Sequence, residues 1–549
     1  MTSETFAGLA AEAIAGYCAE YPDEATVLGD HQHDSRLADP SATAAGRRRT
    51  ELTGLLDRLA QQPALDVAGS VDREILRTQA EAELLSLGEL DADSWDALRH
   101  NPGQALYAVI AQDFAPLPDR LVSVAGRLRA IPDYFAAARN RLTNPSRVHV
   151  ETAIGQLSGT AALITEEIPR LAEQAGLAAE LAEPVRLAAA AVADYQGWLR
   201  DQLPRADRSP RLGEALFASK LALTLATPWQ PKELLAQAYD DLARIEGQLA
   251  ELVAAATGAP ADRAAVAAQL DALAADAPTS ADILDRCRTA LAETTRFVEQ
   301  HELLTLLHDP VEVQEMPEID RGIAVAYCQP VGPLETAPLR TRFAVSPTPA
   351  DWPAERVRSF YREYNGHMLH NLTVHEAMPG HVEQLSHSRR YRGDTMVRSV
   401  FGSGSFVEGW AVYAEELMAE RGYRSDVSAE AAAAVRMQQL KMQLRMIINT
   451  ILDISFHAGD LTEREAMELM TGRGYQEEGE AAGKWRRVQL TSTQLCTYYV
   501  GYLEVRRLMD DLRAAHPDWS DRQLHDSALS FGSPPARHLR TLLGLPPAT

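Results

Sequence analysis

The chain has 549 residues, of which 46% are hydrophobic, so it can bury a large core as two to four domains or as one helical body with a cleft. Its 53 Lys and Arg are outweighed by 77 Asp and Glu, and the net charge of −24 argues against nucleic acid and anionic membrane as partners. We interpret this charge as favouring solubility rather than the steering of cationic substrates.

The first twenty residues carry three glutamates and no basic segment, so we do not expect a signal peptide. No apolar run approaches the length of a membrane span. The cysteines are scattered and form no C-x-x-C pair, which predicts neither a cysteine-type zinc site nor a disulfide framework; they are Cys18, Cys287, Cys328 and Cys496. These features together predict a cytoplasmic protein.

Most of the chain is predicted to be helical, because Ala, Leu, Glu and Arg dominate and apolar residues recur every three or four positions. Residues 70–87 and 231–256 are examples. Pro and Gly interrupt the pattern at 256–266 and 275–283, where we expect loops or hinges.

The character of the sequence changes near residue 310. Residues 322–333 and 339–347 are short, rich in β-forming residues and bounded by Pro or Gly, so they predict two strands. The second strand, "RTRFAVSP", could pair with an extended peptide. We therefore divide the chain into a helical part at 1–305, a short β segment at 306–350 and a helical part at 351–549, which we expect to form one integrated unit.

Four helices are predicted after the β segment, at 353–377, 405–422, 429–459 and 489–515. The first of them ends in a His–Glu pair. The predicted fold class is thus mainly α, with a cleft and a small sheet beside the helix that carries this pair.

The stretch "VHEAMPGHVEQ" at 374–384 resembles a zinc helix, but His375 and His381 are six residues apart instead of four. On a straight helix that spacing gives 240° of rotation and about 9 Å of rise, so one zinc ion could not reach both rings. Pro379 and Gly380 are suited to breaking the helix between them. We predict a break there that returns His381 to the face of His375. A kinked helix with two half-exposed histidines is the alternative.

Glu408 is a candidate third ligand in "FVEGWAVYAEE". It follows His381 by 27 residues and shares a helix face with Val412 and Glu415. A glutamate from a following helix is how His₂Glu zinc sites are completed. Its neighbours are mostly apolar, and a buried acid there needs a partner or a metal. A solvated acidic face is the alternative.

Tyrosines in the last predicted helix could supply a hydrogen bond to a developing oxyanion. They are Tyr498, Tyr499 and Tyr502. Without further context, three tyrosines in a helix are ordinary core residues.

Several motifs together resemble a bacterial family filed as domain of unknown function 885. "HEAMPGHVEQ", "FVEGWAVYAEE", "DISFHAG" and "QLCTYYVG" follow one another in that family's order. The opening "YPDEATVLGDHQHDSRLADPS" and the late "LHDSALSFGSPPARHL" also fit, so the resemblance covers almost the full chain.

That family is similar to zinc peptidases of the gluzincin class, especially the helical oligopeptidases of the thimet and neurolysin type. The resemblance implies a zinc ion (Zn2+) held by His375, His381 and Glu408, with Glu376 as the general base. It also associates three further residues with catalysis, namely Tyr498, His457 and Arg487. The chain departs from the family pattern between residues 483 and 494, where Lys484, Ser492 and Thr493 replace an acidic residue and a Pro-Gly pair.

The resulting prediction is zinc-dependent hydrolysis of an amide bond, most of all in short peptides. Glu376 would take the proton of the water, and Tyr498 or else Tyr502 would bind the oxyanion. Arg487 could hold a substrate carboxylate. An amidohydrolase acting on a small non-peptide amide would use the same ligands, and a non-catalytic helical binding protein is the third possibility. The intact Glu376 argues against the last. Neither the chain-end preference nor the oligomeric state follows from the sequence.

Overall fold

The computed structural model describes residues 5–317, 325–349 and 352–546. Its chain forms two compact units. Unit 1 comprises the chain up to Pro210 together with Val331–Leu339 and Arg392–Phe401. Unit 2 comprises Arg211–Pro330, Arg340–Tyr391 and the chain from Gly402 onward. The predicted ranges 1–305, 306–350 and 351–549 were drawn from composition along the chain, and they stay a prediction.

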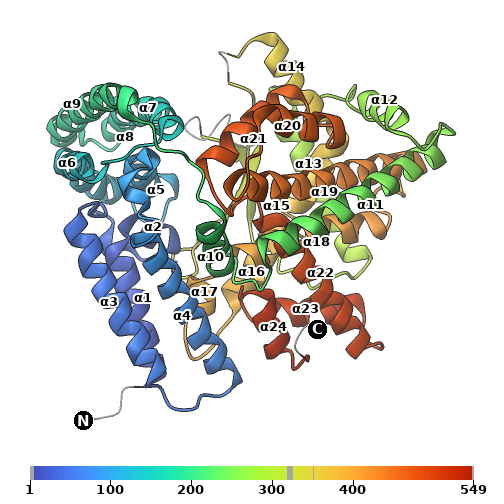
Figure 1. Cartoon of the computed structure of the whole chain (residues 1–549), viewed down its shortest axis with the longest axis horizontal. Helices are drawn as coiled ribbons and strands as arrows, with labels where there is room; N and C mark the ends of the chain where they lie inside the picture. The colour runs from blue at the N-terminus through green and yellow to red at the C-terminus, as the bar shows by residue number, and fades with distance from the viewer. Residues whose placement is uncertain (1–4, 318–324, 350–351, 547–549) are drawn as a thin grey trace. The chain divides into compact units, whose positions relative to one another are not determined.

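Unit 1 is helical (Figure 1). Its helices are α1 (Phe6–Glu20), α2 (Pro22–Leu28), α3 (Ala42–Ala60), α4 (Val67–Leu87), α5 (Gly103–Ala111), α6 (Leu117–Arg141), α7 (Arg147–Ala162), α8 (Ile168–Gln174), α9 (Ala178–Gln202) and α17 (Val397–Val400). The predicted helix at 70–87 is confirmed as part of α4.

Ion pairs and hydrogen bonds join the short late segments to the rest of unit 1. The imidazole of His31 lies 2.9 Å from the carboxylate of Glu335. Arg398 and Asp72 form an ion pair of 2.6 Å in which both side chains are buried. Because a buried charge is costly without a partner, these pairs fix the segments that carry them.

Unit 2 contains a small sheet and the remaining helices. These helices are α10 (Glu214–Thr224), α11 (Pro231–Thr257), α12 (Arg263–Leu273), α13 (Ile283–Gln300), α14 (Ala354–Glu363), α15 (Gly366–Glu376), α16 (His381–Arg390), α18 (Gly404–Glu420), α19 (Ala429–His457), α20 (Glu463–Met467), α21 (Glu478–Leu490), α22 (Thr497–Ala515), α23 (Asp521–Leu529) and α24 (Ala536–Leu542). The predicted mainly α fold with a small sheet is confirmed. Among the described residues, no helix combines the length and the apolar character needed to cross a bilayer.

The sheet has three strands in the order β1 (Val311–Glu315), β3 (Thr341–Val345), β2 (Ala326–Gln329). β3 is parallel to β1 and antiparallel to β2. Both predicted strands are present, although residues 322–324 of the first lie outside the described residues. β1 escaped prediction because its sequence, VEVQE, includes two exposed glutamates.

The prediction that "RTRFAVSP" pairs with a peptide is wrong. β3 is the central strand, and Phe343 is paired with Val313 on one side and with Cys328 on the other. A strand with a neighbour on both sides has no free backbone edge.

Two predicted helices have different bounds in the structure. The helix expected at 353–377 is divided into α14 and α15, because the side chain of Asn365 accepts hydrogen bonds from the N–H groups of His367 and Met368 and so starts a new helix. The helix expected at 489–515 begins only at Thr497. Asp453, on α19, accepts hydrogen bonds from the N–H groups of Thr493, Leu495 and Cys496 and thereby holds the chain in a turn before α22.

Helices α18 and α22 approach each other very closely. A Cβ atom on Gly501 would lie 1.9 Å from the carbonyl oxygen of Ser405, and one on Gly409 would lie 2.2 Å from the backbone of Gly501. Only glycine fits at both positions. This contact brings the start of α22 next to Glu408 on α18.

Candidate metal centre

The chain leaves the helical path between α15 and α16. The N–H group of Gly380 bonds to the carbonyl of Val374, and a Cβ at this glycine would lie 2.0 Å from the carbonyl oxygen of His375. The indole of Trp410, on α18, donates to the carbonyl of Pro379 at 2.9 Å. The predicted helix break at Pro379-Gly380 is confirmed.

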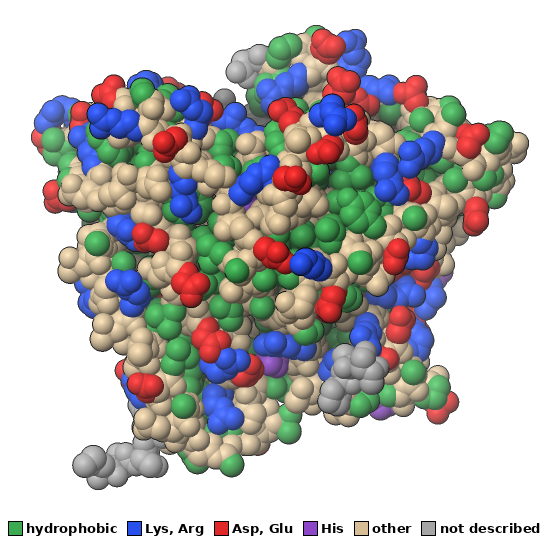
Figure 2. Space-filling view, viewed as in Figure 1, with side chains coloured by type: hydrophobic (Ala, Val, Ile, Leu, Met, Phe, Trp, Pro, Cys, Tyr) green, Lys and Arg blue, Asp and Glu red, His purple; other side chains and the backbone are tan. Residues whose placement is uncertain are grey.

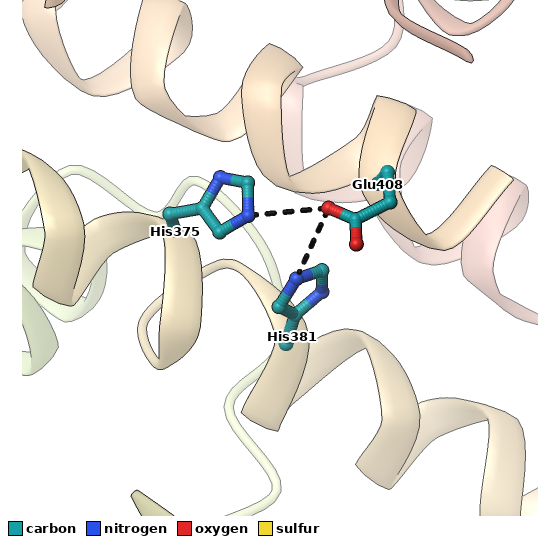
Figure 3. Close-up of side chains that lie close together, drawn as sticks. All are labelled: His375, His381 and Glu408. Atoms are coloured by element: carbon teal, nitrogen blue, oxygen red, sulfur yellow. Dashed lines mark ion pairs between the residues drawn. The ribbon is translucent and has the colours of Figure 1, made fainter. Parts of the chain in front are cut away.

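The break brings two imidazoles and one carboxylate together (Figure 3). Oε2 of Glu408 lies 3.3 Å from Nε2 of His375 and 3.5 Å from Nε2 of His381. The three groups come from the end of α15, the start of α16 and the first turns of α18. One ligand atom of each lies within 4.8 Å of the others.

These distances suit a zinc ion. Two ligand atoms that are each about 2.05 Å from zinc at the tetrahedral angle are about 3.3–3.4 Å apart. Oε2 of Glu408 is also buried and has no hydrogen bond within the described part of the chain. Such an oxygen is costly to bury unless a cation or a donor reaches it. The donor set of two imidazoles and a carboxylate therefore fits zinc.

Glu415 orients the first of the two histidines. Its Oε1 accepts a hydrogen bond of 2.7 Å from Nδ1 of His375, and its Oε2 accepts one of 2.6 Å from the side chain of Asn371. With the proton on Nδ1, the lone pair of Nε2 is directed at the cluster. This residue was not predicted as part of the site, although its seven-residue distance from Glu408 had put both on one helix face.

The pKa values of the cluster residues reflect their pairing. Burial alone would lower the pKa of His375, but the carboxylates of Glu408 and Glu415 raise it well above the ordinary value. Burial would raise the pKa of Glu408, but the imidazoles of His375 and His381 lower it well below the usual range. Glu408 is therefore an anion at neutral pH, as a ligand must be.

Glu376 lies beside the cluster and is held by the sheet. Its Oε2 accepts a hydrogen bond of 2.9 Å from the N–H group of Cys328 in β2. Burial raises the pKa of Glu376, although the neighbouring His375 and His381 act in the opposite direction. A carboxylate with a raised pKa is suited to accepting and returning a proton.

Tyr498 is the one tyrosine of its group that lies next to the cluster. The nearby carboxylate of Glu408, and then burial, raise the pKa of Tyr498, so its hydroxyl remains a donor at neutral pH. Tyr499 donates instead to Asp241 at 2.5 Å, and Tyr502 donates to Glu416 at 2.9 Å.

The other two predicted catalytic residues differ in their surroundings. Arg487 lies beside the hydroxyl of Tyr498 and donates to Oε1 of Gln494 at 2.9 Å. His457 is buried and donates through Nε2 to the carbonyl of Thr491, at 2.7 Å. Burial lowers the pKa of His457 to about 4, so it is neutral near pH 7. Through these contacts both residues support the turn before α22. A catalytic role for His457 stays a prediction.

The surface charge is dispersed. On the face seen in Figure 2, the acidic and basic side chains of the described residues are interspersed rather than gathered by sign. This distribution agrees with a role of the net charge in solubility.

The model of one protein family, described as bacterial protein of unknown function (DUF885), matches residues 22–543. A solved structure from Shewanella oneidensis has 28% sequence identity and a TM-score of 0.83, and covers 98% of this chain and 100% of its own. One from Colwellia psychrerythraea has 18% identity and a TM-score of 0.82, with 98% of each chain covered. Both are described as a "putative lipoprotein".

A third match is an M32 carboxypeptidase from Deinococcus radiodurans R1, with 13% identity over 91% of this chain and 95% of the other. Its TM-score of 0.36 is too low to support an argument. No curated protein matches the chain.

The expectation of a cytoplasmic protein is wrong. It is contradicted by the lipoprotein description of the two similar structures. It had rested on the composition of the first twenty residues and on scattered cysteines, and neither property is peculiar to cytoplasmic proteins.

Proposed function

The chain belongs to this family of bacterial proteins of unknown function, and we propose that it is a zinc-dependent hydrolase that cleaves amide bonds in short peptides. The observation that carries the proposal is the buried oxygen of Glu408, which has no hydrogen bond within the described residues and lies 3.3 and 3.5 Å from the Nε2 atoms of two histidines. The proposed activity is extracytoplasmic, in keeping with the lipoprotein description of the relative at 28% identity.

His375, His381 and Glu408 would hold the metal. When bound there, zinc would act as a Lewis acid towards a substrate carbonyl and would make a water molecule more acidic. His375 is suited to this because its Nδ1 proton is fixed by Glu415, which leaves Nε2 free to coordinate.

Glu376 would act as the general base and then as the general acid. It takes a proton from the attacking water as the oxygen bonds to the carbonyl carbon, and it returns that proton to the amine when the C–N bond breaks. The N–H group of Cys328 fixes one carboxylate oxygen, so the other remains for the water. Tyr498 would donate a hydrogen bond to the oxyanion, since its hydroxyl stays protonated beside Glu408.

Replacing Glu376 by Gln tests the proposal. We expect Glu376→Gln to keep the fold and the metal but to hydrolyse short peptides about 10²–10⁴-fold more slowly, because an amide cannot accept the proton. Glu355→Gln makes the same chemical change at an exposed position of α14 and should leave the rate unchanged. Hydrolysis by Glu376→Gln at the wild-type rate would exclude it as the base.

A further inference from the structure

Two cations lie one helical turn apart on α21, next to the proposed catalytic residues. Arg487 is beside the hydroxyl of Tyr498, and Lys484 precedes it by three residues. Side chains three apart on a helix are neighbours on one face. The pair therefore extends the site from Tyr498 along α21.

Lys484 is a buried lysine, only 5% exposed. Its ammonium makes no hydrogen bond or ion pair within the described residues, although the charges of Glu480 and Glu363 act on it. Lysine is almost never buried in this way unless an anion accompanies it.

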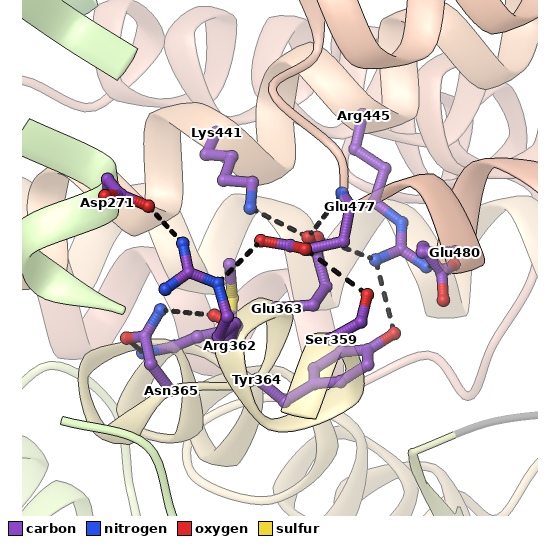
Figure 4. Close-up of polar contacts among 11 residues, drawn as sticks. Asp271, Ser359, Arg362, Glu363, Tyr364, Asn365, Lys441, Arg445, Glu477 and Glu480 are labelled. Carbon is purple, nitrogen blue, oxygen red and sulfur yellow. Dashed lines mark hydrogen bonds and ion pairs between the residues drawn. The ribbon is translucent and has the colours of Figure 1, made fainter. Parts of the chain in front are cut away.

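Glu363 and Glu480, whose charges act on Lys484, each pair with another cation (Figure 4). Glu363 accepts a hydrogen bond of 2.9 Å from Lys441, and Glu480 is paired with Arg445. Arg487 has the neutral side chain of Gln494 as its acceptor. Within the described residues, neither Lys484 nor Arg487 forms an ion pair with a carboxylate.

The pKa of Lys484 agrees with the lack of an ion pair to this lysine within the described residues. Burial, and then the neighbouring guanidinium of Arg445, lower the pKa of Lys484 to about 7, while Glu480 only partly offsets them. An anion bound between Lys484 and Arg487 would favour the charged form of the lysine.

We propose that Lys484 and Arg487 bind a substrate carboxylate, and that the protein therefore acts on peptides that place a carboxylate close to the bond that is cleaved. This inference rests on the proposed peptidase function. Arg487 contacts Tyr498, so a carboxylate held by the two cations is roughly one or two residues from the reacting carbonyl. A free chain end meets this condition in every peptide, whereas an acidic side chain meets it only in some.

Three small ligands distinguish a free chain end from an acidic side chain as the source of the carboxylate. They are N-acetyl-Ala-Ala with a free carboxylate, the same peptide as its amide, and N-acetyl-Ala-Glu amide. We expect wild type to hydrolyse the free acid with a kcat/KM about 10- to 100-fold above that of the amide, because a hydrogen bond to a charged group is lost in the amide. Lys484→Met should remove this preference while zinc content stays the same. Arg486→Met, which removes a cation from the exposed face of the same helix, should preserve it.

Calorimetry of the binding of the three ligands to Glu376→Gln gives a second readout that does not need hydrolysis. If no peptide is cleaved by wild type but the free acid still binds about 10- to 100-fold more tightly than the amide, the peptidase proposal fails and the carboxylate site stands. Tighter binding of the Glu amide than of the free acid would assign the site to an acidic side chain, and equally tight binding of these two, above that of the plain amide, would show that the site accepts either carboxylate.

Equal binding and equal hydrolysis of the free acid and both amides by wild type would overturn the carboxylate site, whether or not Lys484→Met folds.

Discussion

Glu376 and Glu408 are both buried carboxylates, yet their surroundings move their pKa values in opposite directions. Burial raises the pKa of Glu376, whose hydrogen bond comes from a neutral N–H group. Two imidazoles lower the pKa of Glu408 despite its burial. A pair of carboxylates separated in this way can divide the roles of proton acceptor and anionic ligand.

Tyr498 and Tyr499 offer a matched test of the oxyanion donor. Tyr498→Phe should keep zinc and substrate binding but lower kcat by about 10²–10³-fold, since one donor to the oxyanion is lost. Tyr499→Phe removes a hydroxyl that faces Asp241, so it should leave kcat unchanged. Steady-state kinetics and zinc content of both variants check this. A normal kcat in Tyr498→Phe would show that the donor lies elsewhere.

At this scale the sequence predicted which side chains lie together in the cluster and missed those that hold them in place. The spacing of His375, His381 and Glu408 pointed to one cluster, which the structure brings together. The N–H group of Cys328 could not be anticipated, because a backbone donor carries no sequence signal. Glu415 was visible as a second acid on the face of Glu408, but its partner on α15 depends on how the helices pack.

At the scale of elements, the close contact of α18 with α22 determines where Tyr498 lies. Gly501 follows Tyr498 by one turn, and its backbone touches that of Ser405 and Gly409. The glycine lets α22 approach the helix that carries Glu408, and the tyrosine one turn earlier is thereby placed beside that carboxylate.

Gly501→Ala should separate these helices and lower the free energy of unfolding by about 1–3 kcal/mol, the usual cost of overpacking. Gly483 is a matched control inside α21, since a Cβ added there would have open space within 4 Å among the described residues. Gly483→Ala should raise the free energy of unfolding by about 0.5–1 kcal/mol through helix propensity.

Urea unfolding of both variants measures the difference. Equal effects of the two substitutions would mean that the contact at Gly501 does not limit the approach of α18 and α22.

Helix bounds were predictable where local signals decide them. The helix at 231–256 is confirmed as α11, and the third late helix ends at His457, close to the predicted glycine. The turn before Thr497 depends on the carboxylate of Asp453, which lies about forty residues earlier in the sequence. Contacts of that kind have no local pattern, so the start of α22 was predicted too early.

At the scale of the whole molecule, the division into two units could not be predicted from composition. Unit 1 takes in two short segments that are distant in sequence, and buried or half-buried ion pairs together with hydrogen bonds hold them there. All residues of the proposed metal site, by contrast, belong to unit 2.

The central claim is that His375, His381 and Glu408 bind zinc, and elemental analysis of protein purified without chelator tests it most directly. Wild type should carry about one zinc ion per chain, and His381→Ala should carry little, because two ligands do not hold zinc as three do. His387→Ala is the control, since this histidine lies on the same helix but bonds to the carbonyl of Thr305. Zinc retained equally by all three proteins, or absent from wild type supplied with zinc, would contradict the claim.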